Sequence, residues 1–420
     1  MPGKRKVTVD ELPVEIKDDT IYVINQPNPN SVTHNYFKYP CKFIPEIPRW
    51  AMKAYLNCEN GLVLDPFAGS GTTLLEASLA GHESVGAEID EIAKLIIKVK
   101  STKLTDLELQ EVRNITSQIV QRLEESSYSE NEIVLPEINN LTHWFREDIL
   151  NDLGHTYYSI INVGNDNIKD FLLICMASIV KRVSNSDDIS PKPYVSNKIV
   201  KNPPPVAKTF EDVVEKHIIG MKELQEYDLA GIRVEGDATH IAAEDNSIDI
   251  AITSPPYINA FDYVRTLRLE NLWLQLSTED ELREKKKLYL GTESIRVKDE
   301  KTDLSILQES ALLNDYYEQV LPLDEKRALI IKKFFEDMKK NMEEVYRVLK
   351  PNSYYLIVIG NSSIRKVDVE SWRVLKDLAA GVGFQYEKHI GYEIQNPYIR
   401  IPRGNKGGKI AIDHILILKK

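Results

Sequence analysis

The chain has 420 residues, of which 42% are hydrophobic and 28% charged, and its formal net charge is −11. These values are ordinary for globular proteins, so the composition excludes a fibrous repeat and global disorder. The length is typical of two or three domains, or of one large domain with insertions. The apolar stretches fall far short of the ~18 residues of a transmembrane helix, and the amino terminus lacks the apolar core of a secretory signal.

The three cysteines are odd in number and widely spaced, which argues against a disulfide framework and a CxxC metal site. A reducing cytoplasm is the simplest setting for such a chain. The acidic total does not exclude nucleic acid as a partner, because local basic patches matter more than the net charge. The eight histidines show no metal-ligand spacing.

In chain order, residues 1–33 are polar, and we expect them to be a poorly packed lead-in. From there, strands and helices alternate. The predicted elements are a helix over 47–56, a strand over 61–64, a helix over 71–80, a strand over 84–87 and a helix over 91–99. This alternation is typical of a parallel, doubly wound sheet.

Residues 104–230 interrupt the alternation and are predicted to be a mostly helical insertion, because apolar residues recur at helical spacing over 107–123. A second, smaller insertion is predicted for the charged and irregular residues 277–330. Around it, the pattern predicts strands over 232–234, 248–252 and 354–359, helices over 263–276, 334–349 and 369–380, and two final strands over 385–394 and 410–418.

The strand over 61–64 runs into residues 65–73, DPFAGSGTT, and then directly into a helix. Small residues after a strand let the backbone approach a ligand closely, and the helix amino terminus offers unpaired N–H groups. These are features of a cofactor site at the carboxyl end of a strand. The block matches neither the P-loop pattern nor the dinucleotide GxGxxG pattern. Glu88, at the end of the next strand, can accept hydrogen bonds from ribose hydroxyls.

A second block, residues 253–257 (TSPPY), ends the apolar strand over 248–252. Proline cannot continue a central strand, and Pro255 fixes its own φ and restrains Ser254. The carbonyls before and between the prolines are therefore held in a rigid corner, beside a hydroxyl and the flat ring of Tyr257. Such a corner suits an exocyclic amine, whose hydrogens need acceptors and whose ring needs a stacking surface.

Together, these blocks resemble those of the amino-methyltransferases, which methylate exocyclic nitrogens of DNA bases with S-adenosylmethionine. DPFAGSGTT resembles their cofactor loop, and TSPPY resembles their catalytic tetrapeptide with its preceding residue. Residues 34–48 resemble the segment that closes over the methionine end of the cofactor, and residues 236–238 resemble the turn that reads its adenine. The resemblance is firm over 34–90 and 234–273.

The resemblance implies a seven-stranded, Rossmann-like α/β methyltransferase sheet with a final antiparallel hairpin and helical insertions. The catalytic domain would comprise 34–103 and 231–420, and 104–230 would be the candidate target-recognition region. Glu88 would hold the ribose and Asp237 the adenine amine. The residues implied to bind the cofactor are Lys42, Phe43, Pro45, Asp65, Pro66, Phe67, Gly69, Ser70, Gly71, Thr72, Glu88, Asp237 and Thr253. The residues implied to be catalytic are Ser254, Pro255, Pro256 and Tyr257.

The amine is a poor nucleophile because its lone pair is delocalised into the ring. Hydrogen bonds to Ser254 and to the Pro255 carbonyl would draw it toward a tetrahedral form, from which it attacks the sulfonium methyl directly. The base must leave the duplex to reach the pocket, so we expect base flipping, with Tyr257 stacking on the base.

A serine before Pro-Pro-Tyr resembles the cytosine-N4 enzymes, whereas adenine-N6 enzymes more often have Asp or Asn there. We therefore expect methylation of cytosine N4 in a specific double-stranded DNA sequence, in a prokaryotic cytoplasm, as the protective half of a restriction–modification system. A restriction endonuclease would be the functional partner, and no membrane is involved. Cytosine-C5 chemistry needs a nucleophilic cysteine after the cofactor loop, whereas Cys41 precedes it.

Three alternatives remain open. The first is adenine N6 as the target, and the second is amino methylation of RNA of the guanine-N2 type. The third is a cofactor-binding regulatory subunit without activity, against which the intact TSPPY argues.

Two basic segments are candidate DNA contacts, because cations bind phosphate and steer the duplex. Residues 181–208 hold six basic and two acidic residues, and residues 400–409 hold four basic residues and no acid. Solvated loops on an acidic protein are the alternative. The candidate side chains are Lys181, Arg182, Arg400, Arg403, Lys406 and Lys409.

Overall fold

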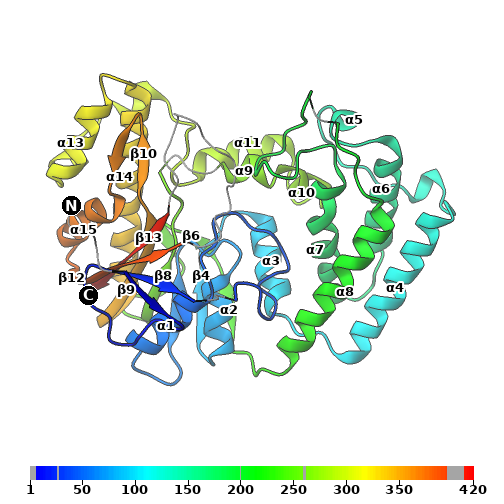
Figure 1. The fold of residues 1–420 in the computed structure, drawn as a ribbon, viewed down its shortest axis with the longest axis horizontal. Coiled ribbons are helices and arrows are strands. Elements are labelled where there is room, and N and C mark those ends of the chain that lie inside the picture. Colours follow the sequence, from blue (N-terminus) through cyan, green and yellow to red (C-terminus); the bar gives the residue numbers. More distant parts are fainter. Residues whose placement is uncertain (1–5, 26–27, 199, 259–261, 395–410) are drawn as a thin grey trace.

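A computed structural model describes residues 6–25, 28–198, 200–258, 262–394 and 411–420. Within them, nine strands form one sheet in the order β1-β2-β12-β13-β9-β8-β3-β4-β5 (Figure 1). These strands are β1 (Lys6–Val9), β2 (Thr20–Ile24), β3 (Leu62–Asp65), β4 (Glu83–Gly86), β5 (Ile232–Val234), β8 (Ile248–Thr253), β9 (Leu349–Gly360), β12 (Gln385–Glu393) and β13 (Ile412–Lys419). Two short hairpins, β6 (Gly236–Asp237) with β7 (His240–Ile241) and β10 (Ser362–Ile364) with β11 (Val367–Val369), lie outside this sheet.

Strand β13 is antiparallel to both neighbours, β12 and β9, while the other neighbouring pairs of the sheet are parallel. The predicted α/β fold with a final antiparallel hairpin is therefore confirmed. The chain order along the sheet reverses between β3 and β8, which lie side by side. In open α/β sheets, ligands bind outside the carboxyl ends of the strands at such a point.

The prediction of a poorly packed lead-in over residues 1–33 is wrong for the strands it contains. β2 pairs in parallel with β12, and β1 pairs with β2, so the two strands extend the sheet beyond the hairpin from the expected seven strands to nine. Ile21, Tyr22 and Ile24 are buried there. The local sequence does not predict β2, because its few apolar residues are surrounded by polar ones. Its partner strand, β12, lies near the opposite end of the chain.

Side chains point alternately to the two faces of the sheet along the central strands, and an apolar cluster covers each face. In β8, Ile250 and Ile252 belong to the apolar cluster that includes α1 (Glu46–Tyr55), and Ala251 belongs to the cluster of α14 (Glu325–Val348). The latter cluster also contains α13 (Ala311–Val320) and α15 (Ser371–Val382). Helix α2 (Thr72–Leu79) follows β3, and α3 (Glu91–Ser101) follows β4. This is the doubly wound arrangement.

The second insertion is more ordered than predicted. Residues 277–330 contain α11 (Glu279–Leu288), α12 (Val297–Glu300), η2 (Ser305–Gln308) and α13, and α14 begins at Glu325, nine positions before the predicted start. The side chain of Asp324 caps α14 by accepting a hydrogen bond from Arg327 N. The charged residues dominate the local sequence, so the helical spacing of the few apolar ones was overlooked.

Residues 104–230 are mostly helical, as their sequence predicts, and lie to one side of the sheet (Figure 1). Their apolar cluster also includes residues of α3 and of α10 (Arg268–Trp273), so this region shares a core with helices that flank the sheet. Its elements are α4 (Asp106–Glu124), η1 (Glu130–Glu132), α5 (Leu141–Trp144), α6 (Glu147–Ile161), α7 (Asp166–Val183) and α8 (Val206–Gln225). Among the described helices, none is long and apolar enough to span a membrane.

Candidate functional site

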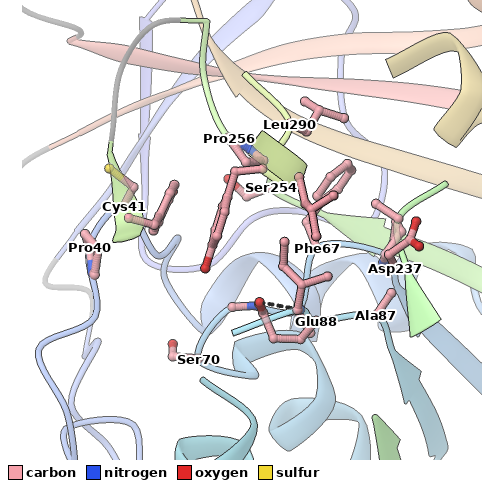
Figure 2. A pocket seen from close by; sticks show the side chains of 18 of the residues that line it. Pro40, Cys41, Phe67, Ser70, Ala87, Glu88, Asp237, Ser254, Pro256 and Leu290 are labelled. Carbon is pink, nitrogen blue, oxygen red and sulfur yellow. Dashed lines mark hydrogen bonds between the residues drawn. The ribbon is translucent and has the colours of Figure 1, made fainter. Parts of the chain in front are cut away.

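A cavity of about 360 Å³ opens where β3, β4 and β8 end, at the point where the strand order reverses. Figure 2 shows Pro40 and Cys41 on one side of it, Asp237 on the other, and Ser254 and Glu88 between them. Its walls therefore come from both sequence blocks, and from the segment that precedes the first. The predicted site residues in the lining are Lys42, Phe43, Pro66, Phe67, Gly69, Ser70, Thr72, Glu88, Asp237, Ser254 and Pro256.

Two glycines give the loop after β3 its shape. Gly69 has φ +51° and Gly71 has φ +73°, both in the left-handed region that favours glycine. A Cβ at Gly71 would lie 2.7 Å from Ile97 Cγ1, and one at Gly69 would lie 3.1 Å from Tyr39 Cε1. The loop is therefore held closely between α3 and Tyr39, with its backbone exposed to the cavity.

Two hydroxyl groups in this loop fit a polar ligand. Ser70 Oγ and Thr72 Oγ1 are buried and have no hydrogen-bond partner among the described residues, although both residues line the cavity. A buried hydroxyl without a partner is costly, and a ligand with donors and acceptors removes that cost. From behind, the buried Lys100 Nζ donates to Ser70 O at 2.7 Å and fixes the loop.

Glu88 closes the loop against the end of β4. Its carboxylate accepts hydrogen bonds from Gly69 N, Ile89 N and Asp90 N, each at 2.8 Å. Burial raises the pKa of Glu88 to about 8, aided by the charge of Asp90 and opposed by the three N–H donors. The residue that the resemblance assigns to the ribose thus also holds the loop after β3 in place.

Asp65 joins the two sequence blocks behind the cavity wall. Its Oδ1 accepts hydrogen bonds from Thr253 Oγ1 at 2.6 Å and from Phe67 N at 3.0 Å. Burial raises its pKa to about 6. Asp65, Thr253, Pro45 and Gly71 are not among the described residues that line the cavity. The hydrogen bonds of Asp65 with Thr253 and Phe67 indicate that Asp65 and Thr253 support the cavity wall from behind.

The turn between β6 and β7 closes the far end of the cavity. Asp237 Oδ1 accepts hydrogen bonds from Thr239 N and Thr239 Oγ1, both at 2.7 Å. Asn341 Nδ2, on α14, donates to Ala238 O at 2.7 Å and so fixes the turn to the sheet domain. Asp237 therefore lies in the cavity lining, and its contact with an adenine amine stays a prediction.

Lys42 lies near the opposite end of the lining. Its Nζ donates to His34 O at 2.6 Å. Burial lowers the pKa of Lys42 to about 8, with a smaller contribution from the charge of Lys216. A partly dehydrated ammonium group beside the cofactor loop suits an anionic ligand such as a carboxylate.

The four residues of the proline corner divide between the cavity and the protein interior. Ser254 and Pro256 line the cavity, whereas Pro255 is buried and Tyr257 is not among the described lining residues. Tyr257 Oη donates to Asp413 Oδ1, on β13, at 2.6 Å. Burial raises the pKa of Asp413 to about 6, although it accepts hydrogen bonds from Tyr257 and Tyr392. The ring of Tyr257 is thereby tied to the final hairpin.

Three tyrosines in the lining were missed by the sequence analysis. Tyr39 and Tyr263 stack with ring centroids 6.0 Å apart, and Tyr263 and Tyr289 stack at 5.9 Å. Tyr289 Oη also donates to Asp90 Oδ2, on the N-cap of α3, at 2.7 Å. Tyr39 lies within the segment over 34–48, whose resemblance was noted without a role for this residue. Tyr289 belongs to the second insertion and carries no local signal.

The candidate DNA contacts have different outcomes. Lys181 Nζ donates to the carbonyl groups of Ser190 and, at 3.4 Å, Pro191, so its ammonium group serves an internal loop. Arg182 is exposed at the end of α7. Arg400, Arg403, Lys406 and Lys409 lie outside the described residues. No cluster of His, Cys, Asp and Glu suited to a metal ion occurs in the described ranges.

A family model described as DNA methylase, N6_N4_Mtase, matches residues 14–99 of this chain. The chain is 25% identical to the Type II methyltransferase M.MvaI of Kocuria varians over 424 residues, covering 94% of this chain and 90% of that protein. It is 23% identical to M.AvaI of Nostoc sp. over 402 residues, covering 86% and 81%.

Among solved structures, a SAM-dependent methyltransferase from Methanosarcina mazei covers 87% of this chain and 94% of its own, with 11% identity and a TM-score of 0.31. The names of the two Type II relatives do not distinguish cytosine N4 from adenine N6. The match to the family model and the similarity to Type II methyltransferases support the N6/N4 DNA methylase family for this chain.

Proposed function

We propose that this protein is an S-adenosylmethionine-dependent DNA methyltransferase that methylates the exocyclic N4 amine of cytosine in a specific duplex sequence and protects host DNA in a restriction–modification system. The observation that carries the proposal is a single cavity with a glycine-bearing loop on one wall and the Ser254–Pro256 corner on another. The Type II relatives support the DNA substrate and the biological setting.

S-adenosylmethionine would supply an electrophilic methyl group at this site. Ser70 and Thr72 have hydroxyls free to bind its polar groups, and Lys42 has an ammonium group suited to its carboxylate. Glu88 and Asp237 both line the cavity, and we assign them to the ribose and the adenine, as the resemblance implies. This set of donors and acceptors fits the cofactor without any metal.

The corner residues act on the target amine. Ser254 Oγ and the Pro255 carbonyl would accept the two N–H hydrogens, which reduces delocalisation of the nitrogen lone pair into the ring. The nitrogen then forms its bond to the methyl carbon as the carbon–sulfur bond breaks, and one amine proton leaves to solvent. Positioning provides most of the rate, so no covalent enzyme intermediate is required.

The target base enters this cavity only after it leaves the duplex, so base flipping is part of the proposal. Serine before Pro-Pro-Tyr favours cytosine over adenine. Adenine N6 is the second candidate, because the Type II relatives and the family model are compatible with both nitrogens.

The first test is to incubate the protein with mixed-sequence DNA and labelled S-adenosylmethionine, digest the DNA to nucleosides and identify the labelled one by mass spectrometry. We expect N4-methylcytosine. N6-methyladenine would overturn the base assignment and retain the enzyme class. Label in RNA and not in DNA under the same conditions would overturn the assignment of DNA as the substrate.

A further inference from the structure

The loop that follows α7 is ordered by lysine ammonium groups instead of by apolar packing. Lys181 Nζ donates to the carbonyls of Ser190 and Pro191. Lys201 Nζ donates to Ser186 O at 2.9 Å and to Asp188 Oδ1 at 2.7 Å. The two cations therefore hold residues 184–198 in a defined shape, which explains why a segment rich in polar residues and proline is compact.

Within this loop, the backbone of Tyr194 is held at both ends while its side chain faces solvent. Asp187 N donates to Tyr194 O at 2.8 Å, and Tyr194 N donates to Ser186 Oγ at 3.0 Å. Asp187 Oδ1 also accepts a hydrogen bond from Ile189 N at 2.8 Å. Yet the side chain of Tyr194 is 53% exposed and that of Ile189 is 66% exposed. The loop thus presents two apolar side chains to solvent on either side of Lys192 in the sequence.

The same loop reaches the rim of the proposed active site. Lys192 lines a small cavity of about 30 Å³ together with Tyr263 and Tyr289. Both tyrosines also line the main cavity. A base that flips into the main cavity would therefore leave the duplex stack close to this loop.

Base flipping indicates which parts of the DNA such a loop would contact. Removing a base from the stack leaves its neighbours without a stacking partner, and proteins that distort duplex DNA insert apolar side chains at such steps. A tyrosine ring offers a stacking surface, and a lysine ammonium group binds the flanking phosphates.

We propose that Tyr194 and Ile189 contact the bases of duplex DNA next to the flipped nucleotide, and that Lys192 binds a flanking phosphate. This inference rests on the proposed DNA methyltransferase function and names the part of the protein that meets the duplex. It also replaces Lys181 as a candidate DNA contact, because Lys181 is engaged inside the loop.

The test compares Tyr194→Ala and Tyr194→Phe with Tyr227→Ala, measuring the Kd for mixed-sequence duplex DNA and the Kd for S-adenosylmethionine. Tyr227 is a matched control, because it is also exposed, at 42%, but follows the carboxyl end of α8, whereas Tyr194 precedes its amino end. We expect Tyr194→Ala to weaken DNA binding by about fivefold or more, the loss of one stacking contact, while Tyr194→Phe and Tyr227→Ala bind normally. The Kd for the cofactor should not change in any variant.

Two further measurements sharpen the result. Ile189→Ala should also weaken DNA binding, and Lys192→Ala should reduce the slope of log Kd against log salt by about 0.9, the loss of one phosphate contact. Unchanged DNA affinity in both Tyr194→Ala and Ile189→Ala would overturn the inference. Failure of the wild type to methylate DNA would contradict the proposed function instead, and the binding measurements do not depend on methyl transfer.

Discussion

The two sides of the cavity are built in different ways. The main wall of the proposed cofactor side is the contiguous loop after β3, with Glu88 two residues beyond the end of the neighbouring strand β4. The base side combines Ser254 and Pro256 with Tyr39, Tyr263 and Tyr289, and its tyrosines come from widely separated parts of the chain. Backbone geometry therefore determines the first side, and long-range side-chain contacts determine the second. Substitutions on the two sides should accordingly affect different steps of the reaction.

The largest expected effect is on the base side. Ser254→Ala should lower methyl transfer by about 100-fold or more, because it removes an acceptor for the amine in the transition state. The Kd for S-adenosylmethionine, measured by calorimetry, should stay within about twofold of wild type, because the cofactor loop is untouched.

The matched control for that variant is Ser247→Ala, at the opposite end of the same strand region, where Ser247 Oγ donates to Glu244 O at 2.7 Å. It should transfer methyl groups normally. Persistent transfer by Ser254→Ala would exclude Ser254 from the reaction.

On the cofactor side, Gly69→Ala should raise the Kd for S-adenosylmethionine by about tenfold, because a left-handed non-glycine residue costs ~1–2 kcal/mol and the loop must move away from Tyr39. Gly81→Ala is the control, since Gly81 also has positive φ, +81°, but has nothing within 4 Å of an added Cβ. That control should lower stability and bind the cofactor normally. Equal cofactor affinity in both variants would contradict a cofactor role for this loop.

A smaller effect should link the base side to the final hairpin. Asp413→Asn weakens the charge-assisted hydrogen bond from Tyr257, so we expect turnover to fall by about fivefold with an unchanged cofactor Kd. Tyr392→Phe removes the other donor to the same carboxylate and should change turnover less. Equal losses in both variants would indicate a structural role of Asp413 instead of control of Tyr257.

The smallest expected effect is the pH dependence of cofactor binding. Lys42 has a pKa lowered to about 8, so it is charged below pH 8 and loses its charge as the pH rises through that value. The KM for S-adenosylmethionine should therefore rise between pH 7 and pH 9, by about threefold for the loss of one partly exposed ion pair.

Glu88, whose pKa is about 8, titrates in the same range and must be separated from Lys42. Lys42→Arg keeps a cation at the position up to much higher pH and leaves Glu88 intact. The rise in KM should disappear in this variant. If it persists, Glu88 or another group causes it.

Local sequence determined much of this protein. The strands and helices from α1 to α3 follow their predicted ranges closely, because each combines a short apolar run with a glycine, a cap or a proline that ends it. The loop over 65–73 and the corner over 253–257 were also predictable from the sequence, since glycine and proline determine the local backbone without contacts to distant residues. The final hairpin follows from two apolar strands at the end of the chain.

Only the tertiary structure decided the rest, because it depends on contacts between residues far apart in the chain. β2 completes the sheet against β12, and Tyr289 reaches Asp90 from the second insertion. The sequence does not determine the role of Lys181, since an ammonium group donates hydrogen bonds equally well to a phosphate or to a carbonyl oxygen. Its half-buried ammonium group donates to the carbonyls of Ser190 and Pro191, which favours a role inside the loop over a DNA contact.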